Sequence, residues 1–167
     1  MRPPAAVIAL SLAAASFLPT ACRKPTDREQ VLSLVSVLAR AAEKDDTEQI
    51  LELLDPAYVD FEGRSKPATG DMLEKYFSRY PAIVVNILRS EVEEMGPQEA
   101  VVAADVALSS GAAKVLRKLA QLSLSNHRFR IKLRKSGQDW LIAFAEWRPL
   151  EAGEIILPQD KGTAGAV

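Results

Sequence analysis

The sequence predicts a single domain of the α+β class, and three observations lead to this prediction. The chain has 167 residues, which is enough for one hydrophobic core but leaves no room for a second. Its first half repeats apolar residues at helical spacing, whereas its second half alternates apolar and polar residues as strands do. Helices followed by antiparallel strands pack with the helices against one face of the sheet.

Composition and charge exclude several classes of protein. With 48% hydrophobic and 26% charged residues, the chain is neither disordered nor a polytopic membrane protein. The 21 basic and 22 acidic residues give a net charge of -1, which offers no basis for nucleic-acid binding. One cysteine excludes an intrachain disulfide and one histidine excludes His-rich zinc sites, so we predict no metal site and no cofactor.

Residues 1–21 have the features of a signal peptide. Arg2 precedes an apolar stretch over residues 5–18, which is short for a bilayer span but suits an export signal. Thr20 and Ala21 then lead into Cys22, the only cysteine. This arrangement resembles the lipobox of bacterial lipoproteins, whose cysteine becomes lipid-modified after cleavage, although Pro19 stands where that family prefers an aliphatic residue. The alternative is a plain secretory signal with an incidental thiol.

The lipoprotein resemblance implies a location in the bacterial cell envelope, with the membrane as a partner through a lipid anchor on Cys22. Arg23 follows the cysteine, where an Asp would be the usual inner-membrane retention signal. The periplasmic face of the outer membrane is therefore favoured in an organism that has one. Residues 22–26 give only a short tether, so the domain is expected close to the membrane surface.

Three helices are expected in the first half of the domain. Residues 26–29 (Thr-Asp-Arg-Glu) form a capping box, after which apolar residues recur at helical spacing to about residue 44. A second helix opens at residues 45–46 and ends before Asp55, because the residue before a proline disfavours the helical region. An extended segment over 58–61 and a loop over 63–70 lead to a third, amphipathic helix at residues 71–80.

Long strands are expected in the second half, at residues 83–92, 100–108, 122–135 and 139–147. Residues 111–121 are predicted as a loop or short helix, and residues 151–167 as a flexible tail. The strand at 122–135 alternates most clearly. One face, predicted to point toward the helices, carries His127, Phe129, Ile131 and Leu133, and the other carries Arg128, Arg130, Lys132 and Arg134. The strand at 139–147 is apolar on both faces, so its facing stays open.

The order of these elements and two short phrases resemble the nuclear transport factor two-like superfamily, which includes SnoaL-like domains. The phrases are Leu-Leu-Asp-Pro-Ala-Tyr-Val-Asp at residues 53–60, and Asp-Trp-Leu-Ile at 139–142 with Trp-Arg-Pro at 147–149. The resemblance covers about residues 27–150. It implies a cystatin-like cone, in which three N-terminal helices pack in the concavity of a curved, mainly antiparallel sheet around an internal pocket. It bears on the fold more than on activity.

Some members of this superfamily are enzymes, including ketosteroid isomerase and polyketide cyclases, whose acid/base carboxylate follows the second helix. Aligned without a gap, that position falls on Phe61, and Asp60 stands one residue early unless a bulge shifts it. The tyrosine that serves as an oxyanion donor on the first helix is replaced by Leu38. His127 could pair with Asp60 as a general base, or it could be a single polar residue near the mouth of the cone.

Aromatic side chains on the third helix and the strands, together with His127, are candidates for lining the pocket. They could hold a small apolar ligand that phenolic hydroxyls orient, or they could simply fill the core. The candidates are Tyr58, Tyr76, Phe77, Tyr80, His127, Phe129, Trp140, Phe144 and Trp147.

The basic face is the last candidate site and consists of Arg128, Arg130, Lys132 and Arg134. It could meet anionic lipid headgroups or an acidic partner protein. Alternatively, it is a solvated face that Glu91, Glu93 and Asp105 partly neutralise.

The sequence therefore favours an exported envelope lipoprotein whose domain is non-catalytic and binds a small apolar ligand or a protein partner. The first alternative is a cyclase-like or isomerase-like enzyme that uses Asp60 and His127 as acid/base groups. The second is a structural domain whose cone is filled by its own side chains.

Overall fold

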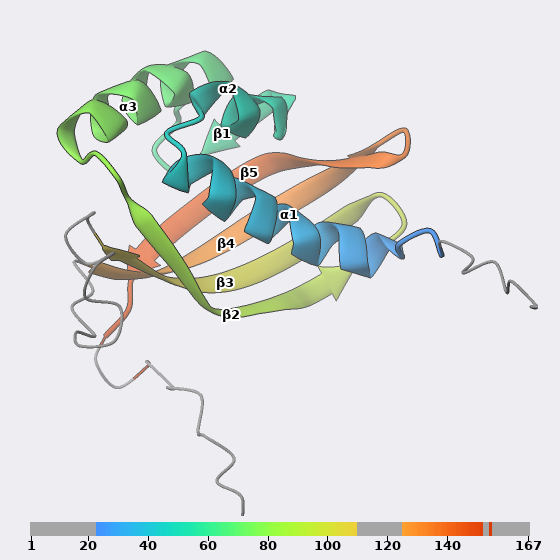
Figure 1. Ribbon diagram of the computed structural model, residues 1–167. Coiled ribbons are helices and arrows are strands. Elements are labelled where there is room, and N and C mark those ends of the chain that lie inside the picture. Colours follow the sequence, from blue (N-terminus) through green and yellow to red (C-terminus); the bar gives the residue numbers. More distant parts are fainter. Residues whose placement is uncertain (1–22, 110–124, 152–153, 155–167) are drawn as a thin grey trace, which may run out of the picture.

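A computed structural model describes residues 23–109, 125–151 and 154 (Figure 1). The predicted signal peptide, Cys22, the segment 111–121 and most of the predicted tail lie outside the described residues. The elements follow one another as α1 (Asp27–Glu43), α2 (Thr47–Glu52), β1 (Leu54–Asp60), α3 (Lys66–Arg79), β2 (Val84–Met95), β3 (Glu99–Ser109), β4 (Ser125–Ser136) and β5 (Asp139–Pro149).

The capping box predicted for α1 is present. The Thr26 hydroxyl accepts a hydrogen bond from the Glu29 amide, and the Glu29 carboxylate accepts one from the Thr26 amide at 2.7 Å. The second helix is shorter than predicted, because the chain enters β1 at Leu54. Leu54 is buried, and the carbonyl of Leu53 accepts a hydrogen bond from the Ile142 amide at 2.8 Å. Pairing with β5 thus begins before the Asp-Pro pair.

Helix α3 begins at Lys66, five residues earlier than predicted. Ser65 is the N-cap residue, and Pro67 lies in the first turn, where its missing amide and fixed φ suit a helix start. Gly70, which favoured a loop in the sequence, lies inside the helix because Leu51 of α2 packs against it. A Cβ atom at residue 70 would lie 3.1 Å from Leu51 Cδ1. The glycine reflects close packing of two helices.

The five strands form one curved sheet in the order β1-β5-β4-β3-β2. Strand β1 runs parallel to β5, and the other neighbours are antiparallel. Helix α1 crosses one face of the sheet, while α2 and α3 lie over its β1 end (Figure 1). The fold class predicted from the sequence is confirmed: an α+β domain with helices packed on a curved, mainly antiparallel sheet.

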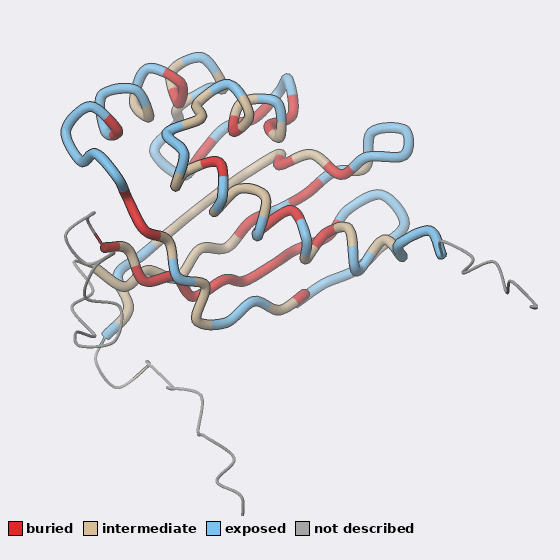
Figure 2. Tube along the Cα trace, viewed as in Figure 1, coloured by how far each residue is buried: buried red, intermediate tan, exposed pale blue. Residues whose placement is uncertain are grey.

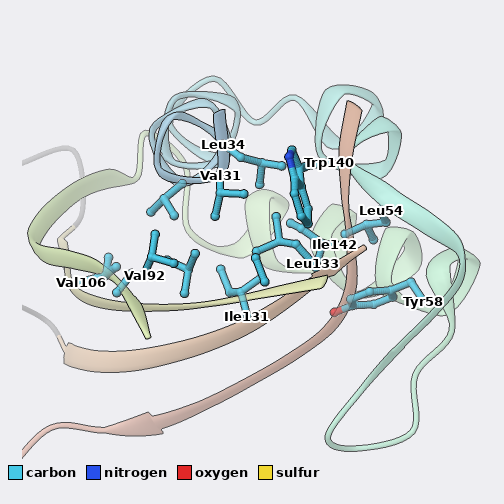
Figure 3. Packing of buried hydrophobic residues seen from close by; sticks show 14 residues of the cluster. Val31, Leu34, Leu54, Tyr58, Val92, Val106, Ile131, Leu133, Trp140 and Ile142 are labelled. Atoms are coloured by element: carbon cyan, nitrogen blue, oxygen red, sulfur yellow. The ribbon is translucent and has the colours of Figure 1, made fainter. Parts of the chain in front are cut away.

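The hydrophobic core lies between α1 and the central strands. Buried positions concentrate on β3 and on the side of α1 that faces the sheet (Figure 2). Val31 and Leu34 of α1 lie close to Leu133 and Ile142, with Trp140 beside Leu34 (Figure 3). This part of the domain is filled by its own side chains.

A bulge in β5 settles the facing that the sequence left open. Lys132 pairs with Phe144, whereas the next residue, Leu133, pairs with Ile142, so Ala143 has no partner on β4. An extra residue reverses the alternation of side chains. Ile142 before the bulge and Trp147 after it therefore face the helices, although their numbers differ in parity.

The start of α1 is fixed to the β4–β5 hairpin. The Asp27 carboxylate accepts hydrogen bonds from Lys135 Nζ at 2.6 Å and from Trp140 Nε1 at 3.3 Å. Lys24 Nζ donates to the Gln138 side chain at 2.7 Å. The first described residues therefore lie at the hairpin end of the sheet, away from α3 (Figure 1).

Candidate ligand-binding cavity

A cavity of about 350 Å³ lies between the second half of α1, helix α3 and the sheet, and strands β1 to β5 all contribute residues to its wall. It is at the lower end of the range for small-molecule sites and is far larger than the space a few waters occupy. Small residues of α1 and of the sheet help to leave this space open. They are Ala39, Ala42, Ala104 and Ala145.

The wall of the cavity is almost entirely apolar. The described lining residues whose side chains carry an O–H or N–H group are Tyr58, Thr69, Tyr76, His127 and Trp147. Within the described part of the chain, no Asp, Glu, Lys or Arg side chain lines it. A charged group placed there would lose its water without gaining an ionic partner.

Six of the nine residues predicted to line a pocket do so: Tyr58, Tyr76, Phe77, His127, Phe129 and Trp147. The other three lie elsewhere. Tyr80 follows the end of α3 and packs on the Tyr76 ring, with centroids 4.9 Å apart. Trp140 belongs to the core at the hairpin end, and Phe144 lies on the outer face of the sheet beneath Lys132. The bulge in β5 explains why Phe144 faces outward.

Several lining residues were not predicted as site residues. Leu38, Met72 and Leu73 are ordinary aliphatic positions of amphipathic helices, so the sequence does not distinguish them from core residues. Thr69 was missed because residues 63–70 were predicted as a loop. The Ser-Lys-Pro sequence at 65–67 was the available signal for a helix start.

Tyr58 of β1 is buried, and its phenol ring contributes to the cavity wall. Burial, and secondarily the negative charge of Asp60, raise the pKa of Tyr58 to about 12. Thr69 beside it opposes this shift only in part, and its hydroxyl oxygen is buried without a well-formed hydrogen bond. The phenol therefore stays protonated and available to a bound molecule.

Asp60 is buried, but its side chain does not line the cavity. Its Oδ1 accepts hydrogen bonds from the amides of Glu62 and Arg64, at 3.0 and 2.9 Å. Its Oδ2 accepts one from Arg64 Nε at 2.7 Å. The carboxylate is thus occupied in closing the connection between β1 and α3, and the structure does not bring it together with His127.

His127 lies on β4 and its ring lines the cavity, as the alternation predicted. Burial lowers the pKa of His127. Its Nδ1 atom is buried and has no hydrogen-bond partner among the described residues. A proton on Nδ1 would lack an acceptor, so the neutral ring with its proton on Nε2 is the favoured form.

The basic face carries ion pairs to neighbouring strands. Arg128 binds both carboxylate oxygens of Asp105, at 2.6 and 2.8 Å, and Arg130 binds Glu93 at 2.8 Å. Arg134 lies 3.6 Å from Asp55. Lys132 Nζ instead lies over the Phe144 ring, 5.3 Å from its centre. Acidic partners within the domain therefore balance much of the positive charge.

Over the described ranges 23–109 and 125–151, no group of three or more His, Cys, Asp and Glu residues could hold a metal ion. No helix in the same ranges is both long and apolar enough to cross a bilayer.

No protein-family model matches the sequence, and no curated protein matches it. Solved structures, in contrast, resemble the fold. The Bd1075 structure from Bdellovibrio bacteriovorus has a TM-score of 0.61 and 19% identity over 74% of this chain. The present chain spans only 41% of the length of that protein.

The match with this chain extends over most of the length of two further solved structures. A protein of unknown function with a cystatin-like fold from Nostoc punctiforme has a TM-score of 0.61 and 12% identity, over 81% of this chain and 98% of its own. A nuclear transport factor two-like protein of unknown function from Pseudomonas putida has a TM-score of 0.61 and 15% identity, over 77% of this chain and 90% of its own. The chain therefore has the nuclear transport factor two-like, or cystatin-like, fold.

Proposed function

We propose that this domain binds a small, mainly apolar molecule in the cavity between α1, α3 and the sheet. The observation that carries the proposal is a space of about 350 Å³ with an almost entirely apolar wall and a few polar side-chain groups. Apolar sites with a few polar groups that fix orientation are typical of small-molecule binding. A cone that served only as a packed core would not need this space.

Binding is favoured over acid/base catalysis because of the position of Asp60. Catalysis by Asp60 and His127 requires both groups to reach the same substrate. Only His127 lines the cavity, while the Asp60 carboxylate is held by two amides and by Arg64. Leu38, at the position of the family's oxyanion donor, contributes only an aliphatic side chain.

Native mass spectrometry of the full chain carrying Cys22→Ser tests this proposal. We expect a discrete added mass that solvent extraction releases and identifies. Ala39→Phe should reduce the bound fraction because the new ring fills part of the cavity. Ser36→Phe adds the same ring to an exposed position of α1 and should leave binding unchanged. A clean apo mass, or a bound mass that Ala39→Phe does not alter, would count against binding in this cavity.

We further propose that the domain is exported and attached to a membrane of the cell envelope through a lipid on Cys22. The support is the apolar stretch at residues 5–18, which leads through two small residues into the only cysteine. Arg23 favours the periplasmic face of the outer membrane where the organism has one.

Membrane fractionation tests the anchor. Wild-type protein should sediment with membranes, and Cys22→Ser should move to the soluble fraction because the lipid is lost. Thr20→Ser, which keeps a small residue beside the cleavage site, is the matched control and should remain with the membranes. Unchanged fractionation of Cys22→Ser would overturn the anchor.

A further inference from the structure

One wall of the cavity is aromatic. Trp147 and Phe129 lie on neighbouring strands with ring centroids 6.0 Å apart, and His127 continues the wall 6.3 Å from Phe129. Phe61 meets the Trp147 ring edge-on at 4.6 Å, and the Arg64 guanidinium lies 5.4 Å from its centre. Because neighbours outside the cavity hold the indole in place, its surface is already formed before any ligand binds.

The wall also favours molecules without charge. The described lining residues include no cation that could pair with a carboxylate or phosphate, and no anion that could pair with an amine. Arg64, which lies over the Trp147 ring, is paired with Asp60, and neither residue lines the cavity. An ionised ligand would therefore pay its loss of hydration without compensation.

His127 adds a directional group to this wall. Its Nδ1 atom is buried and has no hydrogen-bond partner among the described residues, which leaves Nε2 as the ring nitrogen that can carry a useful proton. With its proton on Nε2, the ring offers one N–H donor to a bound molecule. That donor calls for an oxygen acceptor on the ligand.

We propose, on the basis of the proposed binding function, that the ligand is an uncharged molecule whose ring system stacks on Trp147 and Phe129. One of its oxygen atoms accepts a hydrogen bond from His127 Nε2. His127 is then the residue that selects oxygen-bearing molecules over pure hydrocarbons, and the lack of ionised groups in the wall excludes carboxylates.

Three naphthalene probes separate these features: naphthalene itself, naphthyl methyl ketone and naphthoate. Binding to the full chain carrying Cys22→Ser is followed by the two tryptophan indole N–H signals in NMR. Trp147 lines the cavity, whereas Trp140 packs at the hairpin end, so only the Trp147 signal should shift. Trp147→Phe assigns that signal. At neutral pH we expect the ketone to bind about tenfold more tightly than naphthoate.

Variants at His127 test the donor. His127→Leu should abolish the preference for the ketone over naphthalene, because the N–H is lost. His127→Gln supplies an amide N–H and should retain part of that preference. The quantity measured is the ratio of the ketone and naphthalene affinities on the same protein. A general loss of packing or stability weakens both affinities and therefore does not produce the expected change in this ratio.

Where the probes bind, three results would overturn the inference. Naphthoate and the ketone could bind equally, the ketone preference could survive His127→Leu, or the Trp140 signal could shift in place of Trp147. If no probe binds although the purified protein carries a cellular ligand, the ring-stacking inference fails and the binding function stands. If no probe binds and no ligand is carried, both fail.

Discussion

At the scale of single residues, surroundings decide what each polar group does. Asp60 and His127 are both polar residues on strands of the same sheet, yet only the His127 side chain lines the cavity. Three hydrogen-bond donors hold the Asp60 carboxylate, whereas His127 Nδ1 has no described partner. The sequence identified both residues but could not distinguish their roles, because those roles depend on the path of the chain after β1.

Tyr58 gives the domain a specific sensitivity to alkaline pH. Its pKa is about 12 in the folded protein, against 10.0 in a model compound. Between these values the unfolded chain loses the phenolic proton and the folded protein keeps it, so stability falls as the pH rises. The expected loss is about 2 kcal/mol between pH 10 and pH 12.

Urea unfolding of wild type and Tyr58→Phe over this pH range checks the prediction. The stability advantage of wild type over Tyr58→Phe should decrease by the expected loss as the pH rises from 10 to 12. Tyr80→Phe is the control, because the Tyr80 side chain is exposed at the end of α3. Parallel pH profiles for wild type and Tyr58→Phe would show that the phenol of Tyr58 titrates normally.

At the scale of elements, the predictions were accurate where one signal dominated. The capping box placed the start of α1, and the alternation in the strand predicted at 122–135 placed His127, Phe129 and Ile131 toward the helices. They were less accurate where two signals competed. The pair Asp55-Pro56 was predicted to follow directly on the second helix, but it lies within β1. Gly70 was predicted to lie in a loop, but it lies inside α3, where it permits close packing of α2 and α3.

The bulge in β5 shows what the sequence could not supply. The apolar residues on both faces of the strand predicted at 139–147 favoured a strand that is covered on both sides. The structure instead changes the facing at Ala143, so that Trp140, Ile142 and Trp147 all point inward. The position of an unpaired residue depends on pairing with β4, which no local pattern in residues 139–149 records.

Asp60 should act as a structural residue of the β1–α3 connection. Asp60→Ala leaves the Arg64 guanidinium and two amides without their acceptor, and we expect a loss of about 3 kcal/mol in the free energy of unfolding. Glu62→Ala removes an exposed carboxylate that also pairs with Arg64, and it should cost less than about 1 kcal/mol. Urea unfolding of both variants compares the two losses. Equal losses would show that burial of the Asp60 pair has no special role.

At the scale of the whole molecule, the order of helices and strands was enough to predict the fold, while the cavity was predicted only in part. The sequence indicated which elements would surround a pocket. It could not show whether side chains would fill that pocket, because the result depends on the small residues Ala39, Ala42, Ala104 and Ala145 meeting across separate elements. The charge balance of the outer face of the sheet likewise depends on how the strands pair, because pairing places Asp105 beside Arg128 and Glu93 beside Arg130.

The parallel pairing of β1 with β5 has a consequence for the order in which the chain acquires its structure. Leu54 pairs with Ile142, so the strand that follows α2 meets its partner only after nearly the whole domain has been synthesised. Until then, β1 has no neighbour in the described sheet, because it is an edge strand that pairs with β5. Contacts between residues so distant in sequence slow folding. The nascent chain is therefore expected to remain unfolded until its last strand is made, and then to fold as one unit.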